Sequence, residues 1–197
     1  MELKIYESVS GLIFDLAGTL LHSMPIHYEA WKEVFSELGP DLSIGMSLKT
    51  AGMPTGKIFG IIKSEYNPGF DVENLDIKKE NTYAKRMHKL KVIDEVVNVV
   101  YQNNGKRAMS VGAGSPRKNA RESLKLKGLD EYIKILVSKD DVQQHKPHPE
   151  IFLKCAELMG ADPGNCHVFE YGDLGIQTAK SRGMHVTDSR KHLNQTI

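Results

Sequence analysis

The chain has 197 residues, 40% of them hydrophobic and 26% charged, which is typical of one compact unit or a core domain with one modest insertion. Its 26 basic and 25 acidic side chains leave a formal charge of +1 without a long block of one sign, so neither nucleic acid nor an anionic membrane is expected as a partner. No apolar run reaches the length of a membrane helix or of a signal peptide's apolar region. We therefore expect a cytoplasmic monomer in which Cys155 and Cys166 are reduced thiols.

The first predicted element is a buried strand over Gly11 to Phe14, a short apolar run that stops at Asp15 and turns at Gly18. Residues 20–90 then show helical periods and no convincing strand, which predicts a small α-helical cap domain inserted into the core. The expected cap helices run from Pro25 through Leu38 with Gly39-Pro40 as the stop, from about Thr55 to before Asn67-Pro68-Gly69, and roughly from Val72 to Leu90.

Short apolar runs and amphipathic stretches alternate through the rest of the chain. The amphipathic stretches include Glu150 to Met159, and the later predicted strands are Arg107 to Gly112, Ile133 to Val137, Cys166 to Phe169 and Met184 to Thr187. This alternation predicts an α/β fold with a doubly wound, mostly parallel, Rossmann-like sheet that is covered on both faces. Residues 1–19 and 91–197 together are expected to form this core domain.

Polar residues gather directly after several of the predicted strands. Ligands of open parallel α/β sheets bind beyond the carboxyl ends of the strands, so these loops are the candidates for a site. A carboxylate, a hydroxyl, an ammonium group and a further acidic pair would suit a phosphorylated ligand together with Mg²⁺. The loops are Asp15-Leu16-Ala17-Gly18-Thr19, Ala113-Gly114-Ser115, His145-Lys146-Pro147 and Glu170-Tyr171-Gly172-Asp173.

Four segments in this order, FDLAGTLLHSMPIHYEAW, VGAGS, HKPHPEIF and VFEYGDLGI, resemble the motif series of the haloacid dehalogenase superfamily. The most similar branch is that of β-phosphoglucomutase and the fructose-1-phosphate-type phosphatases, and the resemblance covers nearly the whole chain. It implies a Rossmann-like core with a helical cap, a Mg²⁺ cofactor and a small phosphorylated metabolite of the sugar-phosphate type as the ligand. The reaction it implies is hydrolysis or transfer of a phosphoryl group.

The resemblance also implies roles for single residues. Asp15 stands at the position of the nucleophile that forms an aspartyl phosphate, and its carboxylate would also ligate Mg²⁺. Lys146 matches the lysine that neutralises the phosphate and the nucleophile. Gly18 and Thr19 fit the tight turn after the nucleophile, and the backbone carbonyl of Ala17 is a further metal ligand. Taken alone, an Asp after a strand is also a common turn or capping residue.

Phosphate and substrate contacts are expected from two further regions. Gly114 and Ser115 offer backbone N–H groups and a hydroxyl to an anion, although Ser115 is equally well interpreted as a helix N-cap ahead of a proline. In the cap, His27 still matches the motif of the relatives. Lys57 lies in AGMPTGK, which resembles the substrate-specificity loop, but a solvated surface lysine is the alternative interpretation.

Several positions depart from the family pattern. Ala17 replaces the Asp that acts as general acid and base, and Ala113 replaces the Ser or Thr that holds a phosphoryl oxygen. Tyr171 replaces a metal carboxylate next to the retained Glu170, and Asp173 either compensates for it or simply begins a helix. In the cap, acidic residues have become His22 and Met24.

These losses predict a weakly active or inactive phosphatase-like protein. The alternative is a non-catalytic protein that binds phosphate or a sugar phosphate and serves a regulatory role.

Overall fold

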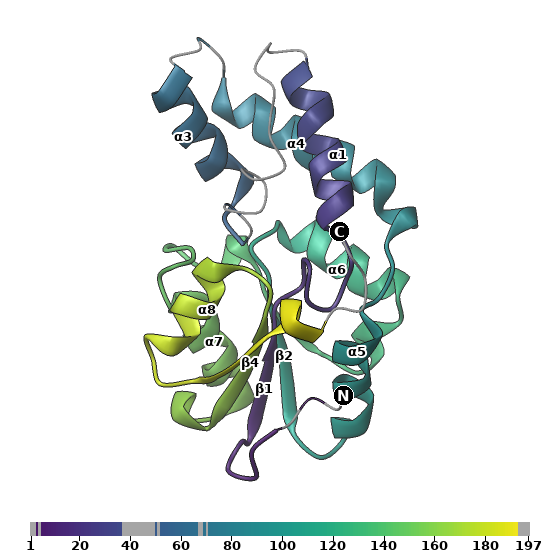
Figure 1. The fold of residues 1–197 in the computed structure, drawn as a ribbon, viewed down its shortest axis with the longest axis vertical. Coiled ribbons are helices and arrows are strands. Elements are labelled where there is room, and N and C mark those ends of the chain that lie inside the picture. Colours follow the sequence, from purple (N-terminus) through teal and green to yellow (C-terminus); the bar gives the residue numbers. More distant parts are fainter. Residues whose placement is uncertain are drawn as a thin grey trace.

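The computed structural model describes residues 3, 5–36, 50, 52–66, 69 and 71–192. Figure 1 shows a sheet with helices on its flanks and a group of helices above it. The strands are β1 (Gly11–Phe14), β2 (Ala108–Gly112), β3 (Ile135–Val137), β4 (Cys166–Glu170) and β5 (His185–Asp188). The helices are α1 (Met24–Ser36), α3 (Thr55–Tyr66), α4 (Val72–Arg86), α5 (Asp94–Asn103), α6 (Arg117–Leu126), α7 (Glu150–Met159) and α8 (Asp173–Lys180).

The strands form one parallel sheet in the order β3-β2-β1-β4-β5, which confirms the predicted α/β fold. The first strand lies at its centre, where Phe14 is paired with Val111 on one side and with Phe169 on the other. Because the strands are parallel and in this register, the residues that follow Phe14, Val111 and Phe169 emerge at the same edge of the sheet.

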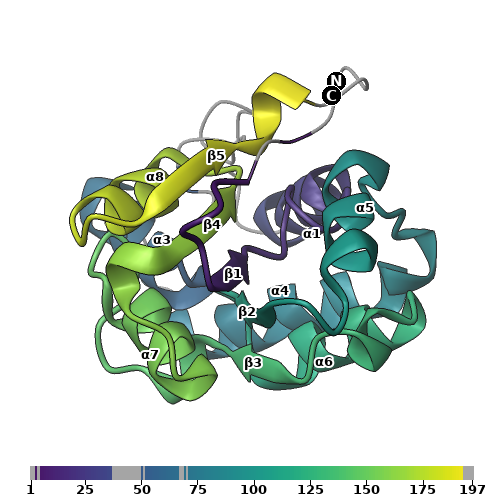
Figure 2. The same ribbon diagram turned by 90° about the horizontal axis from the view of Figure 1, so that it is seen from below.

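Successive residues of β1 face opposite sides of the sheet and so contribute to different cores. Leu12 and Phe14 pack with buried residues of α5 and α6, whereas Ile13 packs with buried residues of α7 and α8. Figure 2, which looks at the molecule from below, shows α5 and α6 on one side of the strands and α7 and α8 on the other. The sheet is therefore doubly wound, as the sequence predicted.

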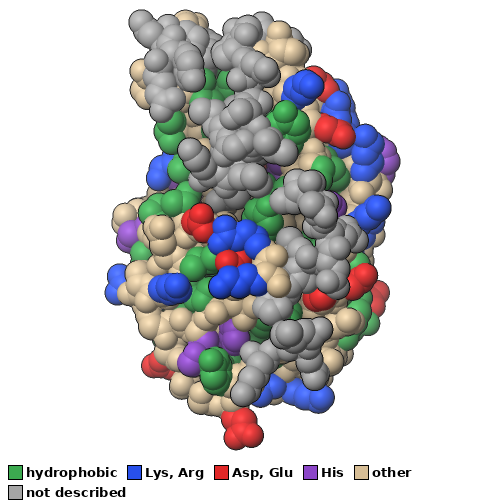
Figure 3. Space-filling view, in the orientation of Figure 1, with side chains coloured by type: hydrophobic (Ala, Val, Ile, Leu, Met, Phe, Trp, Pro, Cys, Tyr) green, Lys and Arg blue, Asp and Glu red, His purple; other side chains and the backbone are tan. Residues whose placement is uncertain are grey.

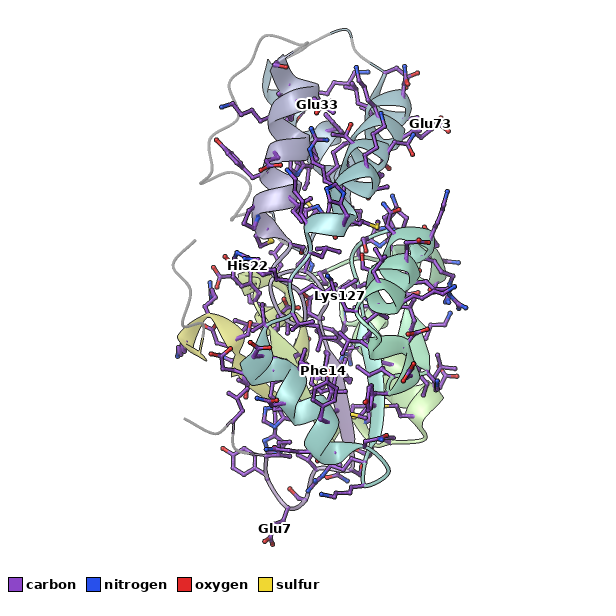
Figure 4. All side chains as sticks on the ribbon, turned by 90° about the vertical axis from the view of Figure 1, so that its right-hand side faces the viewer. Glu7, Phe14, His22, Glu33, Glu73 and Lys127 are labelled. Carbon is purple, nitrogen blue, oxygen red and sulfur yellow. The ribbon has the colours of Figure 1, made fainter. Side chains whose placement is uncertain are left out.

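Helices α1, α3 and α4 pack on one another beyond the carboxyl ends of the strands (Figure 1). Trp31, Phe35 and Phe59 form the aromatic centre of their shared core, so Trp31 and Phe35 belong to the interior of the cap. In Figure 4, Glu33 and Glu73 lie in this helical part and His22 lies at its junction with the sheet. The division of the chain at residues 19/20 and 90/91 remains a prediction.

The last predicted cap helix, over Val72 to Leu90, is shorter than expected. Asp71 caps its first turn, because the side chain accepts hydrogen bonds from the backbone N–H groups of Glu73 and Asn74. The α-helix ends at Arg86, and the chain tightens into a 3₁₀ turn before Leu90 adopts an extended backbone. The predicted stops at Leu38, Gly39-Pro40 and Asn67-Pro68 lie outside the described residues.

The surface carries charges of both signs. On the face drawn in Figure 3, basic side chains are interspersed with acidic and polar ones and form no large block. None of the helices in the described part of the chain is long and apolar enough to span a membrane. Cys155 and Cys166 are both buried free thiols.

Candidate active site

Asp15, Lys146 and Glu170 meet at the carboxyl edge of the sheet. The Nζ atom of Lys146 lies 2.8 Å from Oδ1 of Asp15 and 2.7 Å from Oε2 of Glu170, with the carbonyl oxygen of Gly112 at 3.4 Å. Asp15 directly follows β1, Glu170 is the last residue of β4, and all these ionic groups are buried. The sequence-predicted nucleophile and lysine are thus brought into direct contact.

The Lys146 ammonium is held in its charged form by its neighbours. Burial alone would lower its pKa, but the Asp15 and Glu170 carboxylates outweigh burial and raise the pKa above its ordinary value. The ring of Phe152 covers the same ammonium, with its centroid 4.7 Å from Nζ. A fixed positive charge therefore lies against the Asp15 carboxylate.

Most of the acceptor positions of the Glu170 carboxylate are occupied by hydrogen bonds. Its Oε1 accepts hydrogen bonds from the backbone N–H groups of Tyr171 and Gly172, at 2.9 and 2.8 Å, while Oε2 takes the Lys146 contact. A Cβ on Gly175 would lie 1.9 Å from Oε2, so α8 approaches this carboxylate closely. Burial and the nearby Asp15 carboxylate raise the pKa of Glu170 to about 7, against the opposing effect of Lys146.

An apolar cluster of Ala17, Met24 and Tyr171 lies beside Asp15. Met24 and Tyr171 are buried, and Ala17 packs against them. Gly18, in the left-handed region at φ 82°, also lies under the aromatic ring, since a Cβ there would be only 2.7 Å from Cγ of Tyr171. Three of the positions at which the sequence departs from the family pattern, Ala17, Met24 and Tyr171, are therefore packed together.

A pocket opens above Asp15, between the sheet edge and the cap helices. Its enclosed volume is about 60 Å³, well below that of ordinary small-molecule sites. The core contributes Asp15, Leu16, Ala17, Ala113, Gly114 and Ser115, and the cap side contributes Met24, His27, Trp31, Thr50, Gly52, Met53, Thr55, Ile58, Lys79 and Glu80.

The cap side of this pocket holds a buried ionic network. Nζ of Lys79 lies 2.9 Å from Oε1 of Glu80 and 3.1 Å from Nδ1 of His27, beneath the rings of Trp31 and Tyr83. Burial and the Lys79 charge lower the pKa of His27 to about 3, so its ring is neutral at pH 7.

Lys79 and Glu80 were missed by the sequence analysis, because charged neighbours on an amphipathic helix usually lie in solvent. One signal was available. Leu75, Lys79 and Tyr83 follow each other at four-residue spacing, which places Lys79 on the buried face of α4.

The other predicted substrate contacts fall in different places. Ser115 and Gly114 line the pocket, and a Cβ on Gly114 would lie 2.5 Å from the carbonyl oxygen of Gly52, so the cap loop approaches this backbone closely. Ser115 is not the N-cap of α6: that position belongs to Pro116, so the capping interpretation was wrong. Lys57 is exposed and borders a separate, open hollow with His145 and Pro147.

The tight turn predicted after Asp15 is present. Thr19 is fully buried, and its hydroxyl lies 3.4 Å from Oδ2 of Asp15. Its neighbour Gly18 supplies the left-handed conformation that the turn requires. Both residues support the Asp15 loop and are absent from the pocket lining.

A parallel α/β core that presents a buried aspartate and lysine beneath a helical cap defines a class of hydrolases. The chain belongs to the haloacid dehalogenase-like hydrolase family, which it matches over residues 12–188.

Two curated relatives illustrate the match. The fructose-1-phosphate phosphatase YqaB of Escherichia coli (strain K12) is 39% identical over 188 residues, which cover 94% of this chain and 99% of that protein. The phosphorylated carbohydrates phosphatase of Thermotoga maritima is 27% identical over 190 residues, 89% of this chain and 82% of that protein.

Solved structures agree on the fold. The β-phosphoglucomutase of Clostridium difficile has a TM-score of 0.81 at 21% identity, with 96% of this chain and 90% of that chain covered. A hydrolase from Pseudomonas syringae has a TM-score of 0.82 at 24% identity, with 91% and 84% covered.

Phosphatases of this family generally use Mg²⁺, and the side chains present here do not fit such an ion. Of the predicted ligands, Ala17 offers only its backbone carbonyl, Asp15 contacts Lys146, and Glu170 is engaged by Lys146 and two amides. Asp173 is exposed and accepts a hydrogen bond from Arg190, with Oδ1 2.8 Å from Nη2. Within the described ranges, no three His, Cys, Asp or Glu side chains are placed to hold a metal. The apolar ring of Tyr171 occupies the motif position of the missing carboxylate.

Proposed function

We propose that the protein is a phosphatase-like hydrolase of the sugar-phosphate type that binds small phosphorylated metabolites and turns them over weakly or not at all. The observation that carries this proposal is an ion pair next to an apolar cluster at the carboxyl edge of the sheet. Asp15 and Lys146 are retained in contact, 2.8 Å apart, while Ala17, Met24 and Tyr171 pack as an apolar cluster beside them.

The retained pair supports the first half of phosphoryl transfer. A carboxylate oxygen of Asp15 would attack phosphorus and form an aspartyl phosphate, and the leaving alkoxide oxygen would depart. Lys146 would balance the charge that the phosphoryl oxygens bring to this carboxylate.

Position 17, where the family carries its general acid and base, holds no group that could donate a proton. A methyl group at Ala17 can neither protonate the leaving oxygen nor activate water, a contribution of about 10²- to 10⁴-fold in rate. At 1.36 kcal/mol per tenfold, the barrier rises by roughly 3 to 5 kcal/mol. The loss of a hydroxyl at Ala113 and of a carboxylate at Tyr171 acts in the same direction, although these effects need not add.

The relatives support the ligand class. Two of them are phosphatases whose names specify fructose 1-phosphate and phosphorylated carbohydrates, and the first is 39% identical over nearly its entire length. We further propose a monomeric, cytoplasmic protein, in keeping with the balanced charge of the sequence.

A second candidate function is ligand binding without chemistry, in a regulatory role. It is favoured by the polar lining that survives around the pocket, including Ser115, Thr55 and Lys79. Its sign would be a sugar phosphate that raises the melting temperature of the protein while remaining intact.

The test is an assay against a panel of small sugar phosphates with Mg²⁺, with the Escherichia coli relative as the active reference. We expect kcat/KM values at least about 10²-fold below that reference. Residual activity should disappear in Asp15→Asn. Turnover at rates comparable with the reference, abolished by Asp15→Asn, would refute the proposal of an impaired enzyme. Ligand binding with no detectable turnover would favour the second candidate.

A further inference from the structure

Glu80 is a buried carboxylate that faces the pocket from the cap and is shared between cap and core. Its Oε1 accepts hydrogen bonds from the hydroxyl of Thr55, at 2.6 Å, and from Lys79, at 2.9 Å. Its Oε2 accepts one from the side-chain amide of Asn119 on the core helix α6, at 2.7 Å. The Glu80 side chain is only 9% exposed, and these contacts fix its carboxylate in place.

Glu80 is ionised at neutral pH. Burial alone would raise its pKa, but Lys79, His27 and the Thr55 hydroxyl outweigh burial and lower the pKa to about 2. The Lys79 ammonium is therefore compensated by an adjacent negative charge and is not available as an unpaired cation.

The charges that line the pocket do not favour a highly charged ligand. Among its described lining residues, the ionisable side chains are Asp15, His27, Lys79 and Glu80. His27 is neutral, so these side chains carry two carboxylate charges and one ammonium charge. Lys146 adds a positive charge only at the Asp15 end, where it contacts the carboxylate directly.

The cap side nevertheless retains hydrogen-bonding capacity. A carboxylate offers about four acceptor positions and an ammonium three donors. Contacts between described residues use three of these acceptor positions on Glu80 and two of the donors on Lys79. Within the described part of the chain, one acceptor position of Glu80 and one donor of Lys79 are left, and such groups suit the hydroxyl groups of a sugar or polyol.

We propose that the cap wall selects ligands with one phosphate and free hydroxyl groups, and that Glu80 is the residue that rejects a second phosphate. The proposal rests on the proposed function, because it takes the phosphate end of the ligand to lie at Asp15 and Lys146. A second phosphate at the cap end would meet the fixed Glu80 carboxylate, and no unpaired lysine or arginine of the described lining would balance it. Like charges at a few ångströms in a half-buried site weaken binding by about tenfold or more.

The test compares one sugar with one and with two phosphates. Isothermal titration calorimetry would measure the Kd of fructose 1-phosphate and fructose 1,6-bisphosphate at matched ionic strength, in EDTA, for wild type, Glu80→Gln and Asp76→Asn. Asp76 is the matched control, because it lies one turn earlier on α4, contacts Lys139 and does not line the pocket. If either ester is hydrolysed during the titration, the preference for the monophosphate is taken instead from the ratio of the two kcat/KM values.

We expect wild type to bind the monophosphate at least about tenfold more tightly than the bisphosphate. Glu80→Gln should narrow the ratio of the two Kd values to about threefold or less, and Asp76→Asn should leave this ratio unchanged. Equal or tighter binding of the bisphosphate by wild type would overturn the selection proposed for Glu80 while leaving the proposed function intact. This comparison needs no variant, so it stands even if Glu80→Gln does not fold. Failure of wild type to bind either ligand would overturn both proposals.

Discussion

Tyr171 packs so closely over Gly18 that a Cβ on this glycine would lie 2.7 Å from the Cγ atom of the ring. Gly18 also has a φ of 82°, a conformation that side chains with a Cβ rarely adopt. The turn after Asp15 and the Tyr171 ring, at which the sequence departs from the family pattern, are thus physically coupled.

Gly18→Ala should therefore destabilise the protein in two ways. The left-handed conformation costs about 1 to 3 kcal/mol, and the contact with the ring adds overpacking of similar size. In a Tyr171→Ala background only the conformational part should remain. Urea denaturation of the two single variants, the double variant and wild type measures this coupling. An equal cost of Gly18→Ala in both backgrounds would show that the ring does not press on the turn.

Restoring the family residues one at a time should not restore activity. Ala17→Asp alone buries a carboxylate against Tyr171 and Met24, so we expect lower stability and no gain in turnover. The combined variant Ala17→Asp, Ala113→Thr, Tyr171→Asp removes the ring and supplies the missing oxygens together. It should gain about 10²- to 10⁴-fold in kcat/KM on small sugar phosphates with Mg²⁺.

Two measurements make this result interpretable. Calorimetric titration with Mg²⁺ should detect binding by the combined variant only, and Asp15→Asn should abolish its activity. Full activity from Ala17→Asp alone would contradict the coupling between the three substitutions.

Much of the fold was predictable from local sequence patterns. The strand Gly11–Phe14 and the helix Glu150–Met159 were predicted with the bounds that the structure has, because each combines a clear hydrophobic period with turn residues at its ends. The last cap helix was predicted too long, since Met87 and Leu90 continue the apolar spacing although the backbone has already tightened.

The site was predictable only in part. The contact of Asp15 with Lys146 was expected from the resemblance of their motifs to those of the haloacid dehalogenase superfamily. The role of Glu80 did not, because its partners Thr55 and Asn119 are 25 and 39 residues away in the sequence. Long-range polar contacts leave no periodic trace in a single sequence, which is why the cap side of the pocket emerged only from the structure.

Lys146→Met should destabilise the protein strongly. It removes the only cation in direct contact with Asp15 and Glu170 among the described residues, and a buried charge left without its partner costs about 3 to 5 kcal/mol. Lys57→Met, at an exposed lysine, is the control and should change stability by less than about 0.5 kcal/mol. Adding Glu170→Gln to Lys146→Met should recover part of the loss. Thermal and urea unfolding measure all four proteins, and equal stability of the two lysine variants would argue against a structural role of the ion pair.

The stability of the protein should depend on pH through His167. This histidine is buried, donates or accepts one hydrogen bond with Thr187, and has no partner at Nδ1 in the described part of the chain. Burial and the neighbouring His185 lower its pKa from 6.5 to about 4. Below pH 6.5 the unfolded chain takes up a proton that the folded protein does not, so the contribution of His167 to stability is present above pH 6.5 and is lost as the pH falls towards 4.

Between pH 7 and pH 5 this single group should cost about 2 kcal/mol of unfolding free energy. Glu170 acts in the opposite direction, because its pKa is raised to about 7, so wild type alone does not isolate the effect. His167→Gln retains Glu170 and should therefore lose about 2 kcal/mol less than wild type over the same interval, whereas His88→Gln, at an exposed histidine, should follow wild type. Urea denaturation at both pH values gives these differences. Parallel losses in wild type and His167→Gln would show that His167 does not resist protonation in the folded protein.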